Sequence, residues 1–265
     1  MTRSAPIPLL LLVSLVLAGG CRAREASPPR VGYQVVRTFP HDPAAYTQGL
    51  VYSDTMLYES TGLYGHSDVR VVDLATGRVR KSVPLSGKRF GEGLALLAGR
   101  LYQLTWQSQL GYVYDAGTLA PVDSFRYDGQ GWGLATDGVS LIMSDGSDTL
   151  RFLDPGTFQV TRRLPVSFST GAPATRLNEL EYIDGELFAN VYQSDWIVRI
   201  DPRTGLIREV LDLAALTAEA RARSPMEEVL NGIAFDRRTR HLLVTGKRWG
   251  TLFEISLQNP PGMRP

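Results

Sequence analysis

The residues that could do chemistry in this chain fall at ten equivalent positions of a repeated pattern. In each repeat, one such residue precedes a pair of small or apolar residues, and a second follows the next β-rich stretch. The first position holds Gln48, Glu92, Trp132, Asn178 and Asn231. The second lies 14 residues later in four repeats and 16 later in the fifth, and holds Gly62, Trp106, Gly146, Tyr192 and Lys247. One acid, one base, three amides, three large aromatic rings and two glycines are unlike a core and favour a small polar site.

Each of these residues has an ordinary structural interpretation when it is taken alone. An asparagine before a strand is usually a turn residue, a tryptophan is usually part of the core, and a lysine is usually solvated. The shared register of the ten positions favours a site instead. Glu59, Asp145 and Glu181 could approach the same place, but carboxylates on strands also bond neighbouring strands.

The elements that carry these positions are five repeats, typical of a β-propeller. The pairs that open them are Gly49-Leu50, Gly93-Leu94, Gly133-Leu134, Glu179-Leu180 and Gly232-Ile233. Their spacings of 44, 40, 46 and 53 residues lie in the range of propeller blades. Four of the third strands end at an aspartate that opens a glycine-containing turn, at Asp73, Asp115, Asp154 and Asp201. The sequence therefore predicts an all-β fold, a five-bladed β-propeller.

Strand direction brings the ten positions together. Consecutive strands in a blade are antiparallel, so the start of the first strand and the end of the second lie on the same face of the disc. The innermost strand of each blade borders the central axis, and the ten positions should line one mouth there. Gly62 and Gly146 are expected to leave an opening for the rest of a ligand.

Two irregular segments complete the predicted ring. The fifth repeat stops after its third strand, and the preceding strand Tyr33–Phe39 is expected to pair as its fourth, which would leave no exposed sheet edge at the join. Between blades four and five, Asp212–Val229 has helical spacing and predicts a short helical insertion with Thr217 as its cap.

The first 30 residues are expected to be a secretion signal followed by a linker. Arg3, the apolar run Ile7–Leu17 and the small residues before Cys21 follow the order of a secretory signal peptide, so residues 1–21 are expected to be one. This stretch resembles a lipoprotein signal, with Cys21 lipidated after cleavage; the alternative is ordinary cleavage with a passive Cys21. The expected boundaries are a linker at 22–30, a propeller at 31–258 and a tail at 259–265. We expect an exported protein, periplasmic or membrane-anchored as a lipoprotein.

Composition excludes several classes of function. Net charge is +1 with both signs interspersed, so no nucleic-acid surface or polybasic membrane patch is expected. Cys21 is the only cysteine, which excludes an internal disulfide. The three histidines are scattered, and no zinc, serine-hydrolase or phosphate-loop motif occurs.

Seven segments at these positions carry a resemblance to a known family. They read Tyr46-Thr47-Gln48-Gly49-Leu50, Phe90-Gly91-Glu92-Gly93-Leu94, Leu104-Thr105-Trp106, Gly131-Trp132-Gly133-Leu134, Leu177-Asn178-Glu179-Leu180-Glu181, Leu230-Asn231-Gly232-Ile233-Ala234 and Thr245-Gly246-Lys247. Over roughly Tyr33–Leu257 the chain resembles plant-type glutaminyl-peptide cyclotransferases. The resemblance implies a metal-independent enzyme without a cofactor that closes N-terminal glutamine of peptides or proteins into pyroglutamate with release of ammonia. A monomer is expected, with the membrane reached only through a lipid anchor.

The resemblance also implies roles for residues. Glu92 would be the catalytic proton shuttle, and Lys247 and Asn178 would act beside it. The substrate would contact Gln48, Trp106, Trp132, Tyr192, Asn231 and Tyr46. Tyr46 and Tyr192 depart from the family, which tends to have Phe and Trp there, and a large aromatic ring remains at both positions.

Two other classes remain open at this stage. Glu92 with the amide oxygens of Gln48, Asn178 and Asn231 could form a calcium shell, as in a lactonase-type propeller, although Lys247 would repel a dication. A non-catalytic propeller that binds a protein partner is the other alternative, and it should show a broad apolar or charged rim.

Overall fold

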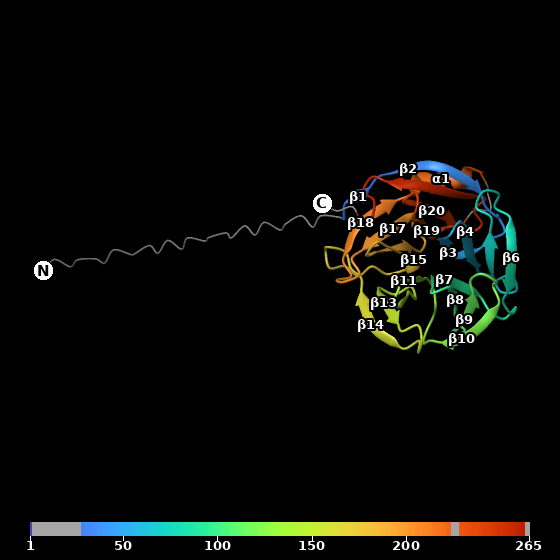
Figure 1. Ribbon diagram of the computed structural model, residues 1–265. Coiled ribbons are helices and arrows are strands. Elements are labelled where there is room, and N and C mark those ends of the chain that lie inside the picture. Colours follow the sequence, from blue (N-terminus) through green and yellow to red (C-terminus); the bar gives the residue numbers. More distant parts are fainter. Residues whose placement is uncertain (2–27, 224–227, 263–265) are drawn as a thin grey trace.

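The chain forms five β-sheets arranged as blades around a central axis (Figure 1). This is a computed structural model, and it describes residues 1, 28–223 and 228–262. The predicted all-β, five-bladed propeller is confirmed. Blades 1 to 3 run from the axis outward in chain order. They consist of β3 (Thr47–Ser53), β4 (Met56–Thr61), β5 (Asp68–Val72) and β6 (Val79–Pro84); β7 (Gly91–Leu97), β8 (Arg100–Thr105), β9 (Leu110–Asp115) and β10 (Pro121–Arg126); and β11 (Leu134–Thr136), β12 (Leu141–Met143), β13 (Thr149–Leu153) and β14 (Val160–Pro165).

Blades 4 and 5 each include a strand from the N-terminal segment. Their strands are β15 (Leu177–Ile183), β16 (Glu186–Val191), β17 (Trp196–Ile200), β18 (Ile207–Asp212) and β1 (Arg30–Val31), then β19 (Leu230–Asp236), β20 (His241–Gly246), β21 (Thr251–Leu257) and β2 (Tyr33–Pro40). β2 pairs antiparallel with β21, from Tyr33 opposite Leu257 to Pro40 opposite Thr251. This pairing confirms that the early strand closes the fifth blade.

β1 extends the fold into the segment expected to be a linker. Arg30 and Val31 pair in parallel with Val210 and Leu211 at the outer edge of blade 4. Val31 is buried, and the Arg30 guanidinium forms an ion pair with Asp212. Ordered pairing therefore starts at Arg30. Cys21, the expected signal peptide and linker residues 22–27 lie outside the described residues.

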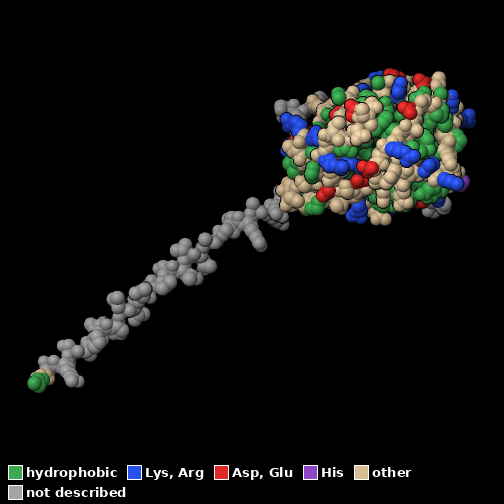
Figure 2. All heavy atoms as spheres, turned by 90° about the horizontal axis from the view of Figure 1, so that it is seen from below, with side chains coloured by type: hydrophobic (Ala, Val, Ile, Leu, Met, Phe, Trp, Pro, Cys, Tyr) green, Lys and Arg blue, Asp and Glu red, His purple; other side chains and the backbone are tan. Residues whose placement is uncertain are grey.

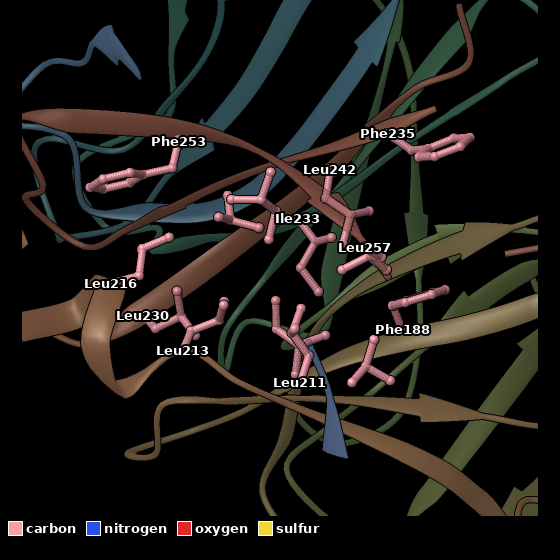
Figure 3. Close-up of a cluster of buried hydrophobic side chains, with 14 of the residues drawn as sticks. Phe188, Leu211, Leu213, Leu216, Leu230, Ile233, Phe235, Leu242, Phe253 and Leu257 are labelled. Carbon is pink, nitrogen blue, oxygen red and sulfur yellow. The ribbon is translucent and has the colours of Figure 1, made fainter. Parts of the chain in front are cut away.

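The core consists of apolar clusters between neighbouring blades. The cluster between blades 4 and 5 combines Phe188 and Leu211 of one with Leu230 and Phe253 of the other (Figure 3). At the axis, the innermost strands approach closely. A Cβ atom on Gly93 would lie 2.4 Å from the backbone nitrogen of Leu134, so only glycine permits this approach.

The predicted helical insertion is helix α1 (Ala214–Arg223). Leu213 and Leu216 join the core between blades 4 and 5 (Figure 3). The predicted cap is wrong, because the Thr217 amide already donates to Leu213 within the helix and the Asp212 carboxylate accepts from the Ala214 amide. An aspartate two residues before the first helical amide is the better cap. Within the described ranges, no helix is long and apolar enough to cross a membrane.

Charged side chains of both signs are mixed on the side of the molecule that Figure 2 shows. The side of the molecule in Figure 2 carries lysine, arginine and acidic side chains interspersed with apolar and neutral groups. This distribution agrees with a net charge of +1 for the chain.

Candidate active site

A cavity of about 220 Å³ lies where the innermost strands begin. Every blade contributes to its lining, which consists of Tyr46, Gln48, Phe90, Glu92, Trp106, Trp132, Asn178, Tyr192 and Lys247. The structure thus brings together eight of the nine residues predicted for the site. The cavity is smaller than the roughly 300–1,000 Å³ of drug-sized pockets, and it suits one amino-acid side chain with its amine.

β-bulges aim the polar side chains of four blades. The register of β3, β7, β15 and β19 shifts by one residue at its start. Gln48, Glu92, Asn178 and Asn231 lie within these shifts. A bulge leaves the extra residue unpaired and turns its side chain out of the alternation of the strand. This explains how residues at the start of a tightly paired inner strand become available to a site.

Among the residues that the structure describes, Glu92 is the only carboxylic acid that lines the cavity. Its side chain is buried, and burial raises its pKa well above the ordinary value, although the positive charge of Lys247 opposes this. No hydrogen bond from the described residues stabilises its ionised form. Desolvation therefore outweighs the attraction of Lys247, and the net shift of the Glu92 pKa is upward. A carboxyl group with a raised pKa is suited to exchanging protons near neutral pH.

Lys247 is held between two tyrosine rings. Its ammonium nitrogen lies 4.7 Å from the ring centre of Tyr46 and 5.1 Å from that of Tyr192. Burial lowers the pKa of Lys247. The charges of Glu92 and Glu228 oppose this effect, but the net shift is downward. Cation–π contacts in a desolvated site stabilise the charged form. Tyr46 and Tyr192 thus form one aromatic clamp on the lysine.

Aromatic rings make the remaining walls. Phe90 packs edge to face with Trp106 at a centroid distance of 5.7 Å, and Trp132 packs likewise with Tyr192 at 5.5 Å. The sequence prediction missed Phe90. It stands two residues before Glu92, as Tyr46 stands two residues before Gln48, and this shared offset could have identified it.

Gly62 and Gly146 do not leave the expected opening. A Cβ atom at Gly62 would lie 2.3 Å from the ring of Phe90, and one at Gly146 would lie 2.8 Å from the indole of Trp132. The space above each glycine is therefore filled by a wall of the cavity. These glycines let the aromatic rings lie flat against the blades.

The three amides differ in position. Gln48 and Asn178 line the cavity, and Asn178 Oδ1 is buried without a hydrogen-bond partner among the described residues. Asn231 is fully buried behind Gln48, where its Nδ2 donates to the Thr47 carbonyl at 2.9 Å and to Gln48 Oε1 at 3.3 Å. Asn231 is predicted to contact the substrate, but it is not among the residues that line the cavity. It orients Gln48 instead.

The other acids near the axis have different surroundings. Glu59 is paired with Arg70 and His41, away from the cavity. Glu179 accepts backbone N–H groups from Leu50 of blade 1 and Ile233 of blade 5, so it ties blades together. Glu181 lines a second cavity formed by the far ends of the innermost strands. Nowhere in residues 28–223 and 228–262 do three or more His, Cys, Asp or Glu side chains form a group that could hold a metal ion.

Known proteins match this chain over most of its length. The glutamine cyclotransferase family description matches residues 9–257. A glutaminyl-peptide cyclotransferase of Arabidopsis thaliana is 46% identical over 228 residues, which cover 85% of this chain and 71% of that protein. The crystal structure of Myxococcus xanthus glutaminyl cyclase superimposes with a TM-score of 0.81 and 36% identity, over 87% of this chain and 98% of the other. On these matches, and on a site built at the same positions of all five blades, the chain belongs to the glutamine cyclotransferase family.

Proposed function

We propose that this protein is a glutaminyl-peptide cyclotransferase, which converts the N-terminal glutamine of peptides and proteins into pyroglutamate and releases ammonia. The observation that carries the proposal is a single buried carboxyl group, Glu92, in a cavity with aromatic walls on the scale of one side chain. Family membership and the name of the Arabidopsis relative support the same activity.

Glu92 is proposed as the proton shuttle. The neutral α-amine of the substrate attacks its own side-chain carboxamide carbon and forms the ring C–N bond, and Glu92 takes the proton that this nitrogen loses. Glu92 then gives the proton to the departing amide nitrogen as its C–N bond breaks, and ammonia leaves. One group serves both steps because the two nitrogens are bonded to the same carbon in the tetrahedral intermediate.

Lys247 and Asn178 are proposed to stabilise the oxyanion of that intermediate. The ammonium of Lys247 is fixed between Tyr46 and Tyr192, so little reorganisation is needed when charge develops. Gln48 and the indoles of Trp106 and Trp132 would hold the glutamine folded on itself. Ring closure is intramolecular, and holding the reactive conformation supplies much of the acceleration.

The alternatives gain no support from the geometry. The cavity presents one carboxyl group beside a lysine, a poor shell for a dication. It is also narrow, whereas a protein partner requires a wide contact surface.

We further propose, from the N-terminal sequence, that the protein is exported and is anchored through a lipid on Cys21, in or facing the periplasm. The support is the apolar run Ile7–Leu17 followed by small residues up to Cys21. We also propose that it acts as a monomer without metal or cofactor.

A direct assay tests the activity. The protein is incubated with a peptide that begins with glutamine, and loss of one ammonia is followed by mass spectrometry. The same peptide with an acetylated N-terminus is the control, because it lacks the nucleophilic amine and should not react. Ammonia loss no faster than in buffer alone would overturn the proposal.

A further inference from the structure

One side-chain oxygen binds both tryptophan walls of the cavity. Oε1 of Gln130 accepts a hydrogen bond from the Trp106 indole at 2.8 Å and from the Trp132 indole at 3.0 Å. An indole N–H only donates, so the atom that faces both must be the amide oxygen. The two indoles belong to different blades, since Trp106 follows β8 and Trp132 precedes β11. Gln130 therefore connects two walls that the sheets alone leave independent.

The backbone of Gln130 is itself held in place. The buried Arg151 on β13 donates to the Gln130 carbonyl at 3.1 Å and to the Asp128 carbonyl at 2.6 Å. The next residue, Gly131, donates its amide to the Trp106 carbonyl at 2.9 Å. The Gln130 side chain is exposed, but these hydrogen bonds fix the backbone to which it is attached.

An indole wall needs such a support. Trp106 and Trp132 are only partly buried, and the torsion between Cβ and an aromatic ring is broad. A ring that turns about this bond changes the shape of a cavity of about 220 Å³. A shared acceptor restricts both rings at once, because each N–H must point at the same oxygen.

We propose that Gln130 is a positioning residue for the cyclisation: it aligns Trp106 and Trp132 so that the glutamine side chain is held in its reactive fold. This inference rests on the proposed function. Gln130 acts through the indoles, so its loss should lower kcat more than it raises KM. Two hydrogen bonds of ordinary strength predict a loss in kcat of roughly 5- to 30-fold.

Two substitutions separate the hydrogen-bonding role of Gln130 from the effects of its side-chain volume and from effects on folding. Gln130→Met keeps an unbranched side chain of similar length but removes the acceptor. Gln130→Glu keeps an oxygen that both indoles can reach, while it removes the amide donor and adds a negative charge at an exposed position, so it should retain kcat within about threefold of the original. Gln107→Met makes the same change at an exposed neighbouring glutamine and should leave kcat unchanged.

A second measurement reports on the indoles without any turnover. In protein labelled with ¹⁵N at tryptophan, the N–H signals of Trp106 and Trp132 should shift and exchange faster with solvent in Gln130→Met. Trp249, which donates to the Glu228 carbonyl, serves as the internal reference and should not change.

The outcomes distinguish the two proposals. Equal loss of kcat in Gln130→Met and Gln130→Glu, or no change of kcat and indole signals in Gln130→Met, would overturn the positioning role. In a different outcome, the original protein fails to cyclise the peptide while Gln130→Met still shifts the N–H signals of Trp106 and Trp132. That result would refute the cyclotransferase activity and leave the hydrogen bonds from the two indoles to Gln130 established.

Discussion

At the scale of single residues, four glutamates near the axis, three of them buried and Glu181 partly buried, show that the partners of a carboxyl group decide its role. Burial would raise the pKa of Glu59, but Arg70 and His41 outweigh it and lower the pKa to about 2. Burial raises the pKa of Glu181 to about 8. Glu179 is committed to backbone donors of two other blades. Glu92 alone combines a raised pKa with an unbonded carboxyl group in the main cavity.

The first prediction concerns the proton shuttle. Glu92→Gln preserves shape and removes proton transfer, so kcat should fall by about 10²- to 10⁴-fold with a modest change in KM. The thermal transition should stay within a few degrees, because the Glu92 carboxyl group makes no hydrogen bond to any described residue and its backbone contact with Ser60 is kept. The measurement is steady-state cyclisation of a glutamine-initiated peptide.

Glu181→Gln is the matched control for this substitution. Glu181 is also an inner-strand glutamate, partly buried, but it lines the far cavity, so its substitution should leave the original kcat unchanged. If Glu92→Gln turned over normally, the proton transfer would have to be reassigned to another group.

The second prediction concerns metal ions. The three histidines are not among the residues that line the cavity, and its one carboxyl group lies near a lysine, so cyclisation should survive prolonged treatment with a chelator. The measurement compares kcat before and after exhaustive dialysis against a chelator. A loss of activity that zinc or calcium restores would refute the mechanism.

At the scale of elements, the repeat predicted the strands well because spacing and alternation are local properties. The early strand expected at Tyr33–Phe39 is β2 (Tyr33–Pro40), one residue longer than predicted. The residues that pack behind or above a strand come from distant parts of the sequence. The burial of Asn231 behind Gln48 and the packing of rings over Gly62 and Gly146 depend on neighbouring blades, so the sequence pattern could not show them.

The third prediction concerns the strands that the N-terminal segment supplies. Removing residues 1–27 should leave the fold intact. Removing residues 1–40 deletes β1 and β2, exposes the edge of β21 and should cause aggregation. Size-exclusion chromatography with light scattering measures the difference.

An intermediate truncation separates the two strands. Removing residues 1–31 deletes only β1, with its ion pair from Arg30 to Asp212, and should lower the melting temperature without aggregation. The sequence placed Arg30 at the end of the expected linker, and its pairing in β1 makes it part of the fold. Equal solubility of all three truncated proteins would contradict closure of the ring by β2.

At the scale of the whole molecule, the seam that closes the ring also supports the site. The backbone amide of Arg248 donates to the Ala45 carbonyl at 2.6 Å, and that of His41 donates to Gly250 at 3.1 Å. The segments joined in this way carry Lys247 and Tyr46, which form the clamp in the cavity. The hydrogen bonds that close the ring therefore also fix the positions of Lys247 and Tyr46 in the cavity.

His41 links this seam through both ring nitrogens. Nδ1 lies 2.6 Å from the Trp249 carbonyl oxygen and Nε2 lies 3.1 Å from a carboxylate oxygen of Glu59. Both partners are acceptors, so both nitrogens must donate and the ring is an imidazolium. Burial lowers the pKa of His41, but the Glu59 carboxylate and the Trp249 carbonyl outweigh it, and the net shift is upward.

The last prediction follows from the sign of that shift. A group whose pKa is raised on folding stabilises the native state fully below its unfolded pKa of 6.5, and this contribution is lost as pH rises through the folded pKa. His41→Gln should therefore lower the free energy of unfolding most below pH 6.5, and the difference from the original protein should narrow as pH increases. Denaturant unfolding at several pH values from about 5 to about 9 measures it, with the exposed His66→Gln as control. A difference that stays constant over this range would mean that His41 is neutral, and the seam would then have to be held by the backbone bonds and the Glu59–Arg70 pair alone.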